Sequence, residues 1–296
     1  MSNIADLKQL QEEMGFVETL GSLVQTYEEI YVTRMQKIRK SVVGTRQFTE
    51  GLAEIFGELR LHNLRSRLEQ QNKGTVKQLE KVVTGERLAV LLTTSQRWSG
   101  EINRQVFTEF WQYTKRHPSS AVMIIGKVGK EMYDQLEGKA GYWYFDLAED
   151  ANNIEILNQI LHRLVEYKEV IVFYGKFISF VHQEKSRIRL TGTEGGSHKG
   201  PEGKLKPMRA YLFEPGLKII LDFFESQIVS ALFKQSMHES YLAQLGSRVM
   251  VLEKAVKQIE DEQQSLAYKH RKLQRGLNYK QQMQAIVGIY YGGSYR

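Results

Sequence analysis

The feature that most constrains the fold is an apolar repeat at each end of the chain. Near both termini, apolar residues recur at alternating steps of three and four. A period near 3.5 keeps one stripe of a helix facing a partner helix over many turns, which is typical of a coiled coil. The stripes consist of Leu7, Leu10, Met14, Val17, Val24, Tyr31, Met35, Ile38 and Val42, and of Leu242, Leu245, Val249, Leu252, Val256, Ile259, Leu266, Leu273 and Leu277.

Neither stripe is perfect. Leu20 and Tyr27 stand one residue before the ideal positions, which are Gly21 and Glu28. The four prolines lie at positions 118, 201, 207 and 215, so both ends lack the strongest helix breaker. A pair of amphipathic helices on an ordinary globular core is the alternative, but helices this long are rare in compact domains. The polar stripe positions of the second segment are Gln263, His270 and Lys280.

The middle of the chain has a different pattern. Short apolar runs rich in β-branched residues, at 88–94, 121–126 and 169–175, predict buried parallel strands. Helix-like stripes at 102–111 and 156–164 follow the first two runs, and Asn152 or Asn153 is a plausible cap of the second helix. Strands that alternate with helices predict a Rossmann-like α/β domain. We also expect antiparallel strands at 177–182 and 209–214, and a mobile Gly-rich loop at 184–207.

The predicted fold is therefore α/β, with a long antiparallel coiled coil of the N- and C-terminal helices and a Rossmann-like domain inserted between them. The expected boundaries are 1–75 for the first helix, 76–214 for the α/β domain and 215–296 for the last helix.

Catalytic motifs are missing from the sequence. GKVGK (126–130) follows a strand but lacks the spacing and the Lys-Ser/Thr ending of a phosphate-binding loop, so a tight turn is favoured. No HExxH pair occurs, the chain has no cysteine, and Ser197 next to His198 in a loop is not a catalytic triad. No run of 18 apolar residues predicts a membrane span, and the amino terminus lacks a signal-peptide layout. We expect a non-enzymatic chain with no metal and no cofactor.

Charge is concentrated on the two predicted long helices. The net charge of +7 suggests an acidic partner, which could be nucleic acid, anionic lipid or an acidic protein surface. Charge runs on helices are usually solvated faces, but one basic band on each helix favours a shared acidic partner. Aromatic stacking platforms that would favour nucleic acid are missing beside the bands. The bands are Arg34, Lys37, Arg39, Lys40 and Arg46, and Lys269, Arg271, Lys272, Arg275 and Lys280.

Several motifs, in order along the chain, resemble those of the gamma subunits of F-type ATP synthases. LAVLLTTSQRWSGEINRQVF (88–107) resembles that family's strand followed by Ser-x-Arg and Gly-x-Leu-Asn, and VMIIGKVGK (122–130) resembles its next strand and Gly-Lys-x-Gly turn. FYGKFIS (173–179) is similar to Tyr-Asn-Lys-Phe-Ile-Ser, and FESQIVSAL (224–232) is similar to the start of the family's last helix. The matching residues include Ser95, Arg97, Gly100, Asn103, Gly126, Lys127, Glu225, Ser226 and Gln227.

The chain also departs from that family's pattern. LGSLVQTYEEIYV (20–32) stands where the family has a Lys-rich stretch with Met-Lys-Met-Val, and Gln96 to Gly100 replace Gly-Leu-Cys-Gly. Near the end, Arg275 and Gln281 are retained from the family's Arg-Gln and Ile-Thr-Gln-Glu-Ile motifs.

The resemblance implies a central rotor stalk rather than a catalytic subunit. It implies a non-catalytic shaft inside three alpha and three beta ATPase subunits, bound to an epsilon-type subunit and a membrane c-ring, without nucleic acid or a membrane span. The location would be peripheral, on the cytoplasmic face of a bacterial inner membrane or the matrix or stromal side in an organelle. The basic bands would face acidic lever segments, and Arg275 and Gln281 would grip the catch loop of the catalytic subunit. The alternatives are the shaft of a specialised ATPase that only hydrolyses ATP, and a coiled-coil scaffold or nucleic-acid-binding protein.

Overall fold

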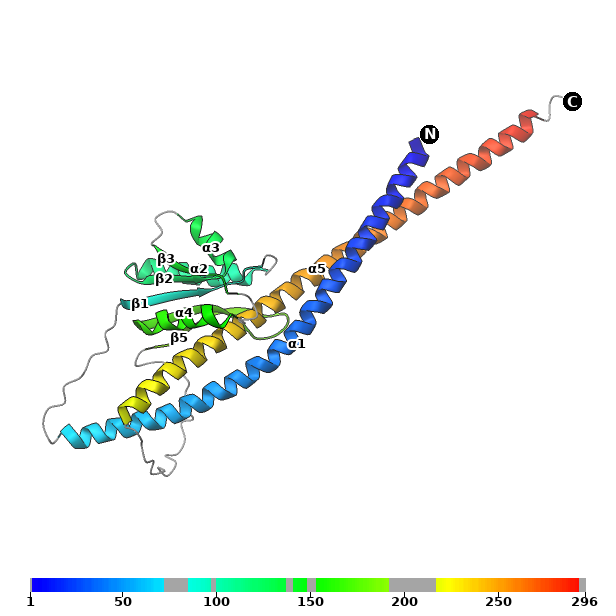
Figure 1. The fold of residues 1–296 in the computed structure, drawn as a ribbon. Helices are drawn as coiled ribbons and strands as arrows, with labels where there is room; N and C mark the ends of the chain where they lie inside the picture. Colours follow the sequence, from blue (N-terminus) through cyan, green and yellow to red (C-terminus); the bar gives the residue numbers. More distant parts are fainter. Residues whose placement is uncertain are drawn as a thin grey trace. The chain divides into compact units, whose positions relative to one another are not determined.

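The computed structural model describes residues 2–71, 85–96, 100–136, 141–147, 153–191 and 217–292. It divides into two compact units, a terminal unit (1–32 and 249–296) and a sheet unit (33–248). The elements, in chain order, are α1 (Ser2–Gln71), β1 (Gly85–Leu92), α2 (Ile102–Arg116), β2 (Ala121–Ile125), α3 (Lys127–Asp134), β3 (Tyr142–Phe145), α4 (Ile154–Val165), β4 (Tyr167–Phe177), β5 (Gln183–Arg189) and α5 (Leu217–Gly292) (Figure 1).

The terminal unit consists of the amino-terminal part of α1 and the carboxy-terminal part of α5, packed antiparallel. Gln11 lies beside His270, with their Nε2 atoms 3.4 Å apart, and Gly21 lies against Ile259. The buried and half-buried positions of α1 follow the predicted stripe, which confirms the coiled coil. In that part of α1 they are Leu7, Leu10, Met14, Val17, Gly21, Val24, Glu28 and Tyr31, together with Val32 next to the stripe.

The ideal stripe positions, rather than the larger neighbours, face the partner helix. Leu20 and Tyr27 are 39% and 53% exposed, whereas Gly21 and Glu28 are half-buried. A Cβ atom at Gly21 would lie 3.2 Å from Cγ2 of Ile259, so the glycine lets the two helices approach closely. The helical period therefore decides which residues lie in the seam, even where a small or charged side chain occupies the position.

The sheet unit is built on a five-stranded sheet with the order β3-β2-β1-β4-β5. β1 pairs in parallel with β2 and β4, β2 pairs in parallel with β3, and β5 is antiparallel to β4. One face packs against α2 and α3, and the other packs against α4 and the part of α5 around Phe233. Because both faces are covered, β1 and β4 bury side chains on both sides, which explains their uninterrupted apolar runs.

Most of the predicted elements of this unit are confirmed, but some predictions were wrong. The expected loop at 184–207 begins with strand β5, and residues 178–182, expected as a strand, form the turn before it. β5 is an edge strand with charged residues at Glu184, Lys185, Arg187 and Arg189, and this polarity makes it resemble a loop in the sequence. α3 and β3 were not foreseen, and the expected strand at 209–214 lies outside the described residues.

Local capping explains where α4 begins. Asn153 lies at the N-cap with an extended backbone, and its side-chain oxygen accepts a hydrogen bond from the backbone N–H of Ile156 at 3.3 Å. This satisfies one of the donors that a helix start leaves open. Of the two candidate caps, Asn153 is the one the structure uses.

A glycine test separates backbone strain from helix propensity. Gly126 has a φ of 99°, and a Cβ atom there would lie 2.3 Å from the carbonyl oxygen of Thr93. We expect Gly126→Ala to lower the free energy of unfolding by about 2 kcal/mol or more. Gly44, inside α1, has open space around it, so Gly44→Ala should raise that free energy by roughly 0.5–1 kcal/mol.

Both variants lie in the sheet unit, as do Trp111 and Trp143. Urea denaturation followed by tryptophan fluorescence therefore measures both effects. Equal stability of the Gly126→Ala chain and the parent would contradict the backbone geometry described above.

Candidate functional site: a buried segment of α5 and the basic faces of the long helices

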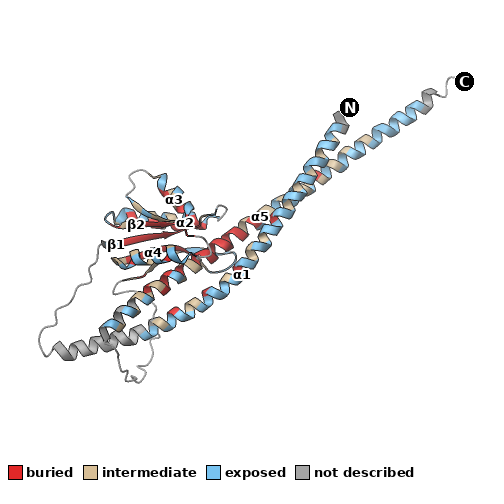
Figure 2. Cartoon of the chain, in the orientation of Figure 1, coloured by how far each residue is buried: buried red, intermediate tan, exposed pale blue. Residues whose placement is uncertain are grey.

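One part of α5 is enclosed on all sides. Every residue from 239 to 248, hereafter the buried segment, is buried, including the guanidinium-bearing side chain of Arg248 at 1% exposure (Figure 2). A helix at the surface of a protein normally has one exposed polar face. Because the buried segment has no exposed face, it lies in the centre of the sheet unit. It is the place at which the long helix is held by the α/β domain.

Small residues let β4 and its neighbours approach this helix. A Cβ atom at Gly175 of β4 would lie 3.3 Å from Cβ of Ala243 and 2.8 Å from Cγ1 of Ile102. A Cβ atom at Gly246 of α5 would lie 3.3 Å from the Phe177 ring. Larger side chains at these glycines would push the helix away from the strand, so close backbone contact, rather than interlocking large side chains, holds the two together.

The residues that follow β1 hold the buried segment from another side. Gly100 has a φ of 61° and lies so close to Ser247 that a side chain there would clash with its Oγ atom. Nη2 of Arg248 donates a hydrogen bond to Oγ1 of Thr94 at 3.4 Å. In open α/β sheets, ligands bind beyond the carboxyl ends of the strands where the strand order reverses, which here is between β1 and β4. In this chain α5 packs against that loop, which agrees with the absence of a phosphate-binding sequence there.

A partly buried ion pair joins α1 to α5 within the sheet unit. Nε of Arg46 donates to Oε1 of Glu239 at 2.8 Å, and Nε2 of Gln235 donates to the same oxygen at 3.0 Å. The Glu239 side chain is 3% exposed. Tyr174 of β4 lies nearby: burial, and then the charge of Glu239, raises the pKa of its hydroxyl to about 12. Arg46 therefore has a structural role, although the sequence grouped it with the first basic band.

The remaining residues of the basic bands are exposed. Arg34, Lys37, Arg39 and Lys40 lie on α1 in the sheet unit, and Lys269, Arg271, Lys272, Arg275 and Lys280 lie on α5 in the terminal unit. Gln281, the other candidate contact of the catch loop, is exposed next to Lys280. Arg271 donates a hydrogen bond to the backbone oxygen of Ala267, which keeps its side chain along the helix. The two bands thus belong to different units and form two separate candidate surfaces. Their roles in binding stay predictions.

The motif residues of the sheet unit hold loops together. Oγ of Ser95 donates to Oδ1 of Asp146 at 2.5 Å and accepts a hydrogen bond from the backbone N–H of Lys127 at 3.3 Å. Thr93 accepts a hydrogen bond from the backbone N–H of Gly129 and packs against Gly126. These contacts join the carboxyl ends of β1, β2 and β3, so GKVGK forms a turn and the first part of α3.

The other motif residues are dispersed. Asn103 is buried at the start of α2, and Ser226 donates to the backbone oxygen of Phe223. Glu225 lies in α5, and Arg97 lies outside the described residues. Gln227 lines a cavity of about 290 Å³ between α1 and α5, together with Thr45, Phe48, Ser230, Lys234 and His238. Burial, and then the charge of Lys234, lowers the pKa of His238, which keeps its ring neutral near pH 7.

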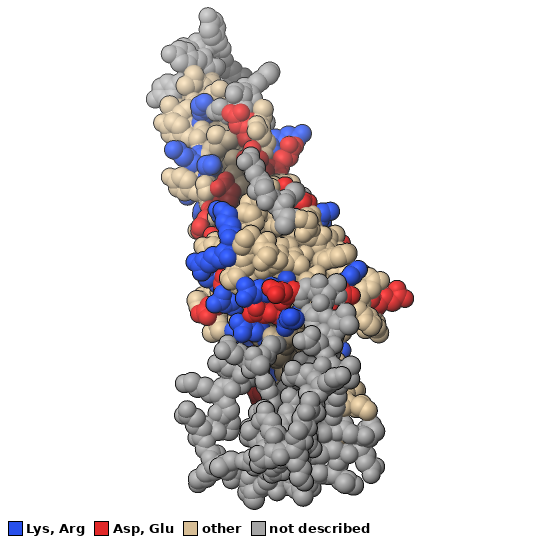
Figure 3. Space-filling view, turned by 90° about the vertical axis from the view of Figure 1, so that its left-hand side faces the viewer, with Lys and Arg blue, Asp and Glu red and all other residues tan. Residues whose placement is uncertain are grey.

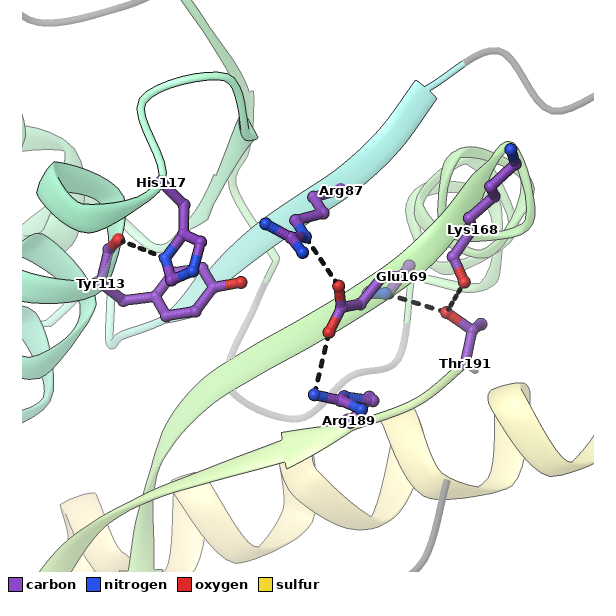
Figure 4. A network of polar contacts seen from close by, with 8 residues as sticks. Arg87, Tyr113, His117, Lys168, Glu169, Arg189 and Thr191 are labelled. Carbon is purple, nitrogen blue, oxygen red and sulfur yellow. Dashed lines mark hydrogen bonds and ion pairs between the residues drawn. The ribbon is translucent and has the colours of Figure 1, made fainter. Parts of the chain in front are cut away.

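A second polar network lies at the amino ends of β1 and β4. Glu169 accepts from Arg87 at 2.8 Å and from Arg189 at 3.0 Å, and Oγ1 of Thr191 donates to the backbone oxygen of Lys168 (Figure 4). Burial, and then Glu169, raises the pKa of Tyr113, whose ring stacks on His117. Lysine and arginine side chains gather around acidic ones on one face of the molecule (Figure 3). The Glu169 carboxylate on β4 is paired with one guanidinium from β1 and one from β5. The network therefore joins three strands.

Among the described residues, no group of histidine and acidic side chains is arranged to hold a metal ion. None of the described helices is long and apolar enough to cross a bilayer.

The buried segment was not predicted from the sequence. A signal was present, because small residues recur at steps of four, three and four in this part of α5, at Ser236, Ser240, Ala243 and Ser247. Such a stripe indicates a helix that approaches another backbone closely.

Comparisons with known proteins agree with this architecture. The model of the ATP synthase family matches residues 6–276. The ATP synthase gamma chain of Roseiflexus sp. (strain RS-1) is 20% identical over 275 residues, covering 90% of this chain and 91% of the relative. That of Elusimicrobium minutum (strain Pei191) is 22% identical over 273 residues, covering 85% and 87%.

Two solved structures share the fold. A chain of the central stalk and c-ring of the Tetrahymena thermophila mitochondrial ATP synthase has a TM-score of 0.56 at 13% identity, covering 79% of this chain and 99% of that one. A chain of the Euglena gracilis mitochondrial ATP synthase rotor has a TM-score of 0.55 at 16% identity, covering 92% and 99%.

The Arg46–Glu239 pair can be tested by a double-mutant cycle. Arg46→Met leaves a buried carboxylate without its cation, so we expect it to lower the free energy of unfolding by about 2 kcal/mol, less than for a fully buried pair because Arg46 is 39% exposed. Adding Glu239→Met should restore most of that loss, since both charges are then gone. Urea denaturation measures the cycle. Additive effects of the two substitutions would show that the pair is not a unit.

Proposed function

Because this chain belongs to the ATP synthase family, we propose that it is the central rotor stalk that couples a rotating membrane ring to a catalytic hexamer. One observation carries the proposal: a single family model spans residues 6–276, and thus both long helices together with the sheet domain. A chain that shared only the α/β domain or only a coiled coil would not match over this length.

The continuity of α5 is the physical basis of the proposed coupling. α5 runs without interruption from Leu217 to Gly292, and its residues belong to both the sheet unit and the terminal unit. The buried segment fixes this helix in the α/β domain, so rotation of the domain turns the helix with it. Each orientation of an asymmetric shaft favours a different conformation of each catalytic site around it, which is an allosteric coupling through a rigid element.

The proposed partners follow from the rotor role. The similar solved structures are a central stalk with its c-ring and a rotor, both of mitochondrial ATP synthases. We infer that the chain binds three alpha and three beta ATPase subunits, an epsilon-type subunit and a c-ring, and that the complex transports H+ or Na+. The chain itself supplies no catalytic group and binds no cofactor. It would lie at the membrane surface, on the cytoplasmic side in a bacterium.

The exposed basic bands fit contacts that change during rotation. Arg34, Lys37, Arg39 and Lys40, and Lys269, Arg271 and Lys272, present long flexible cations to solvent. Such charges attract acidic segments without fixing one register, which suits a shaft that must pass successive subunits. Arg275 and Gln281, exposed near the end of α5, are the proposed contacts of the catch loop.

Recovery of the complex tests the rotor role. A tagged chain, expressed with its neighbouring subunit genes, should copurify with alpha- and beta-type nucleotide-binding subunits in a ratio of three to three to one. Native mass spectrometry gives the ratio. Recovery of the chain alone, or with nucleic acid, contradicts the proposal.

A charge-reversal variant tests the second band. In the assembled complex, Arg271→Glu, Lys272→Glu and Arg275→Glu together should weaken coupling between rotation and ATP hydrolysis about tenfold, because three exposed contacts are each worth roughly 0.5 kcal/mol. Torque measured on single complexes is the readout. The control reverses Arg104, Lys115 and Arg116, three exposed cations of α2, by the same charge. Equal torque in both variants would show that the band is a solvated face.

A further inference from the structure

α1 carries a second apolar stripe, which no described residue covers. Its side chains are far more exposed than those of the seam, where Val24 is only 8% exposed. The outer stripe consists of Phe16 (69% exposed), Leu20 (39%), Leu23 (52%), Tyr27 (53%) and Ile30 (42%). Isolated exposed apolar residues are ordinary, but a contiguous row of large ones marks an interaction surface.

The spacing of the outer stripe identifies the shape of the partner. Its residues follow one another at steps of four, three, four and three, and each stands one residue before a seam position from Val17 to Tyr31. The stripe therefore lies beside the seam and has the same period, along roughly 20 Å of helix. A straight apolar row of this period is matched by another α-helix, which would pack against α1 beside α5 as a third strand.

Two threonines near the stripe donate their hydroxyl hydrogen bonds to the backbone of α1 itself. The hydroxyl groups of Thr19 and Thr26 each donate a hydrogen bond, 2.8 Å long, to the backbone oxygen four residues earlier, so they do not point toward a partner. None of the five stripe residues is charged, and a partner face against it must also be uncharged.

The charge of this part of α1, with Glu12 and Glu13 beside the stripe at its amino end, identifies the chemistry of the partner. Between Lys8 and Arg34, α1 has five glutamates and no basic residue. In the same unit, residues 253–262 of α5 hold four acidic side chains and two lysines. This acidic zone repels anionic lipid and a second copy of the same zone, and it attracts a basic surface. The net charge of the whole chain is +7, so the acidic zone is not evident from the overall composition.

We propose that the outer stripe binds an amphipathic helix of the catalytic hexamer whose apolar row is bordered by lysine or arginine. This inference rests on the proposed rotor function. At the basic bands, the expected partner segments are acidic. At the outer stripe, the proposed partner is basic. The contact is apolar at its centre and electrostatic at its border.

The absence of cysteine from the sequence makes the inference testable with a single introduced thiol. Leu23→Cys places a fluorescent label on the outer stripe, and Gln25→Cys places it on the opposite, exposed side of α1. In complexes with alpha- and beta-type subunits, quenching of the label by neutral acrylamide should fall several-fold at position 23 and much less at position 25.

Three outcomes would overturn the inference. If the hexamer assembles but position 23 remains as accessible as position 25, the stripe is not a contact and the rotor function stands. If position 23 becomes protected in the isolated chain as its concentration rises, the stripe binds a second copy. If no hexamer assembles at all, both the rotor function and this inference fail.

Two substitution pairs test the chemistry of the contact. Leu23→Ser should weaken binding of the chain to the hexamer about tenfold, since it removes a leucine buried on binding, whereas Gln25→Ser should change it little. Charge reversal of Glu12 and Glu13 to lysine should weaken binding more than the same change at Glu18 and Glu29. Glu12 and Glu13 lie at the amino end of the stripe, whereas Glu18 and Glu29 lie on the other side of the helix. Equal effects within either pair would contradict the stated partner chemistry.

Discussion

Close backbone packing around one helix is the constraint on which the rest of the sheet unit depends. The buried segment of α5 contacts β4 through Gly175 and Ala243, and it contacts the end of the β1 loop through Gly100 and Ser247. Glycine, alanine and serine at these positions bring the backbones close together and leave no long side chain that could turn between rotamers. A helix held in this way cannot rotate about its own axis inside the domain. A subunit that transmits torque requires this property, and a binding module does not.

Buried charge makes this arrangement specific. Glu239 has one cationic partner from another helix, Arg46, and Arg248 is enclosed beside Thr94. A slip of one residue along α5 would separate Arg46 from a carboxylate that water cannot reach, which is costly. The apolar seam alone tolerates shifts by a whole heptad, because it repeats. The seam therefore gives affinity between the long helices, and the ion pair fixes their register within the sheet unit.

Sequence periodicity was sufficient to predict α1, α2, α4 and α5, but not the short helix α3 and not every face of the long helices. The seam was predictable even at Gly21 and Glu28, since helix geometry overrides residue size. The strands β1, β2 and β4 were predictable because both of their sides are buried, whereas β5 looked like a loop because its charged residues face solvent. The buried segment was missed because Glu239, Gln244 and Arg248 are polar, and because Arg46 and Thr94, which pair with Glu239 and Arg248, lie far away in the sequence. Leu20 and Tyr27 looked like errors in the seam, yet they belong to the outer stripe.

The most direct test of the rotor account is to observe rotation. The hexamer is fixed to a surface, and a bead is attached through a cysteine introduced at exposed Lys185 of β5, in a chain that has no other cysteine. With ATP, the bead should turn in one direction, in steps of about one third of a turn, because each of three catalytic sites acts in succession. A bead that remains attached but only fluctuates without direction, while the hexamer hydrolyses ATP, would contradict the account.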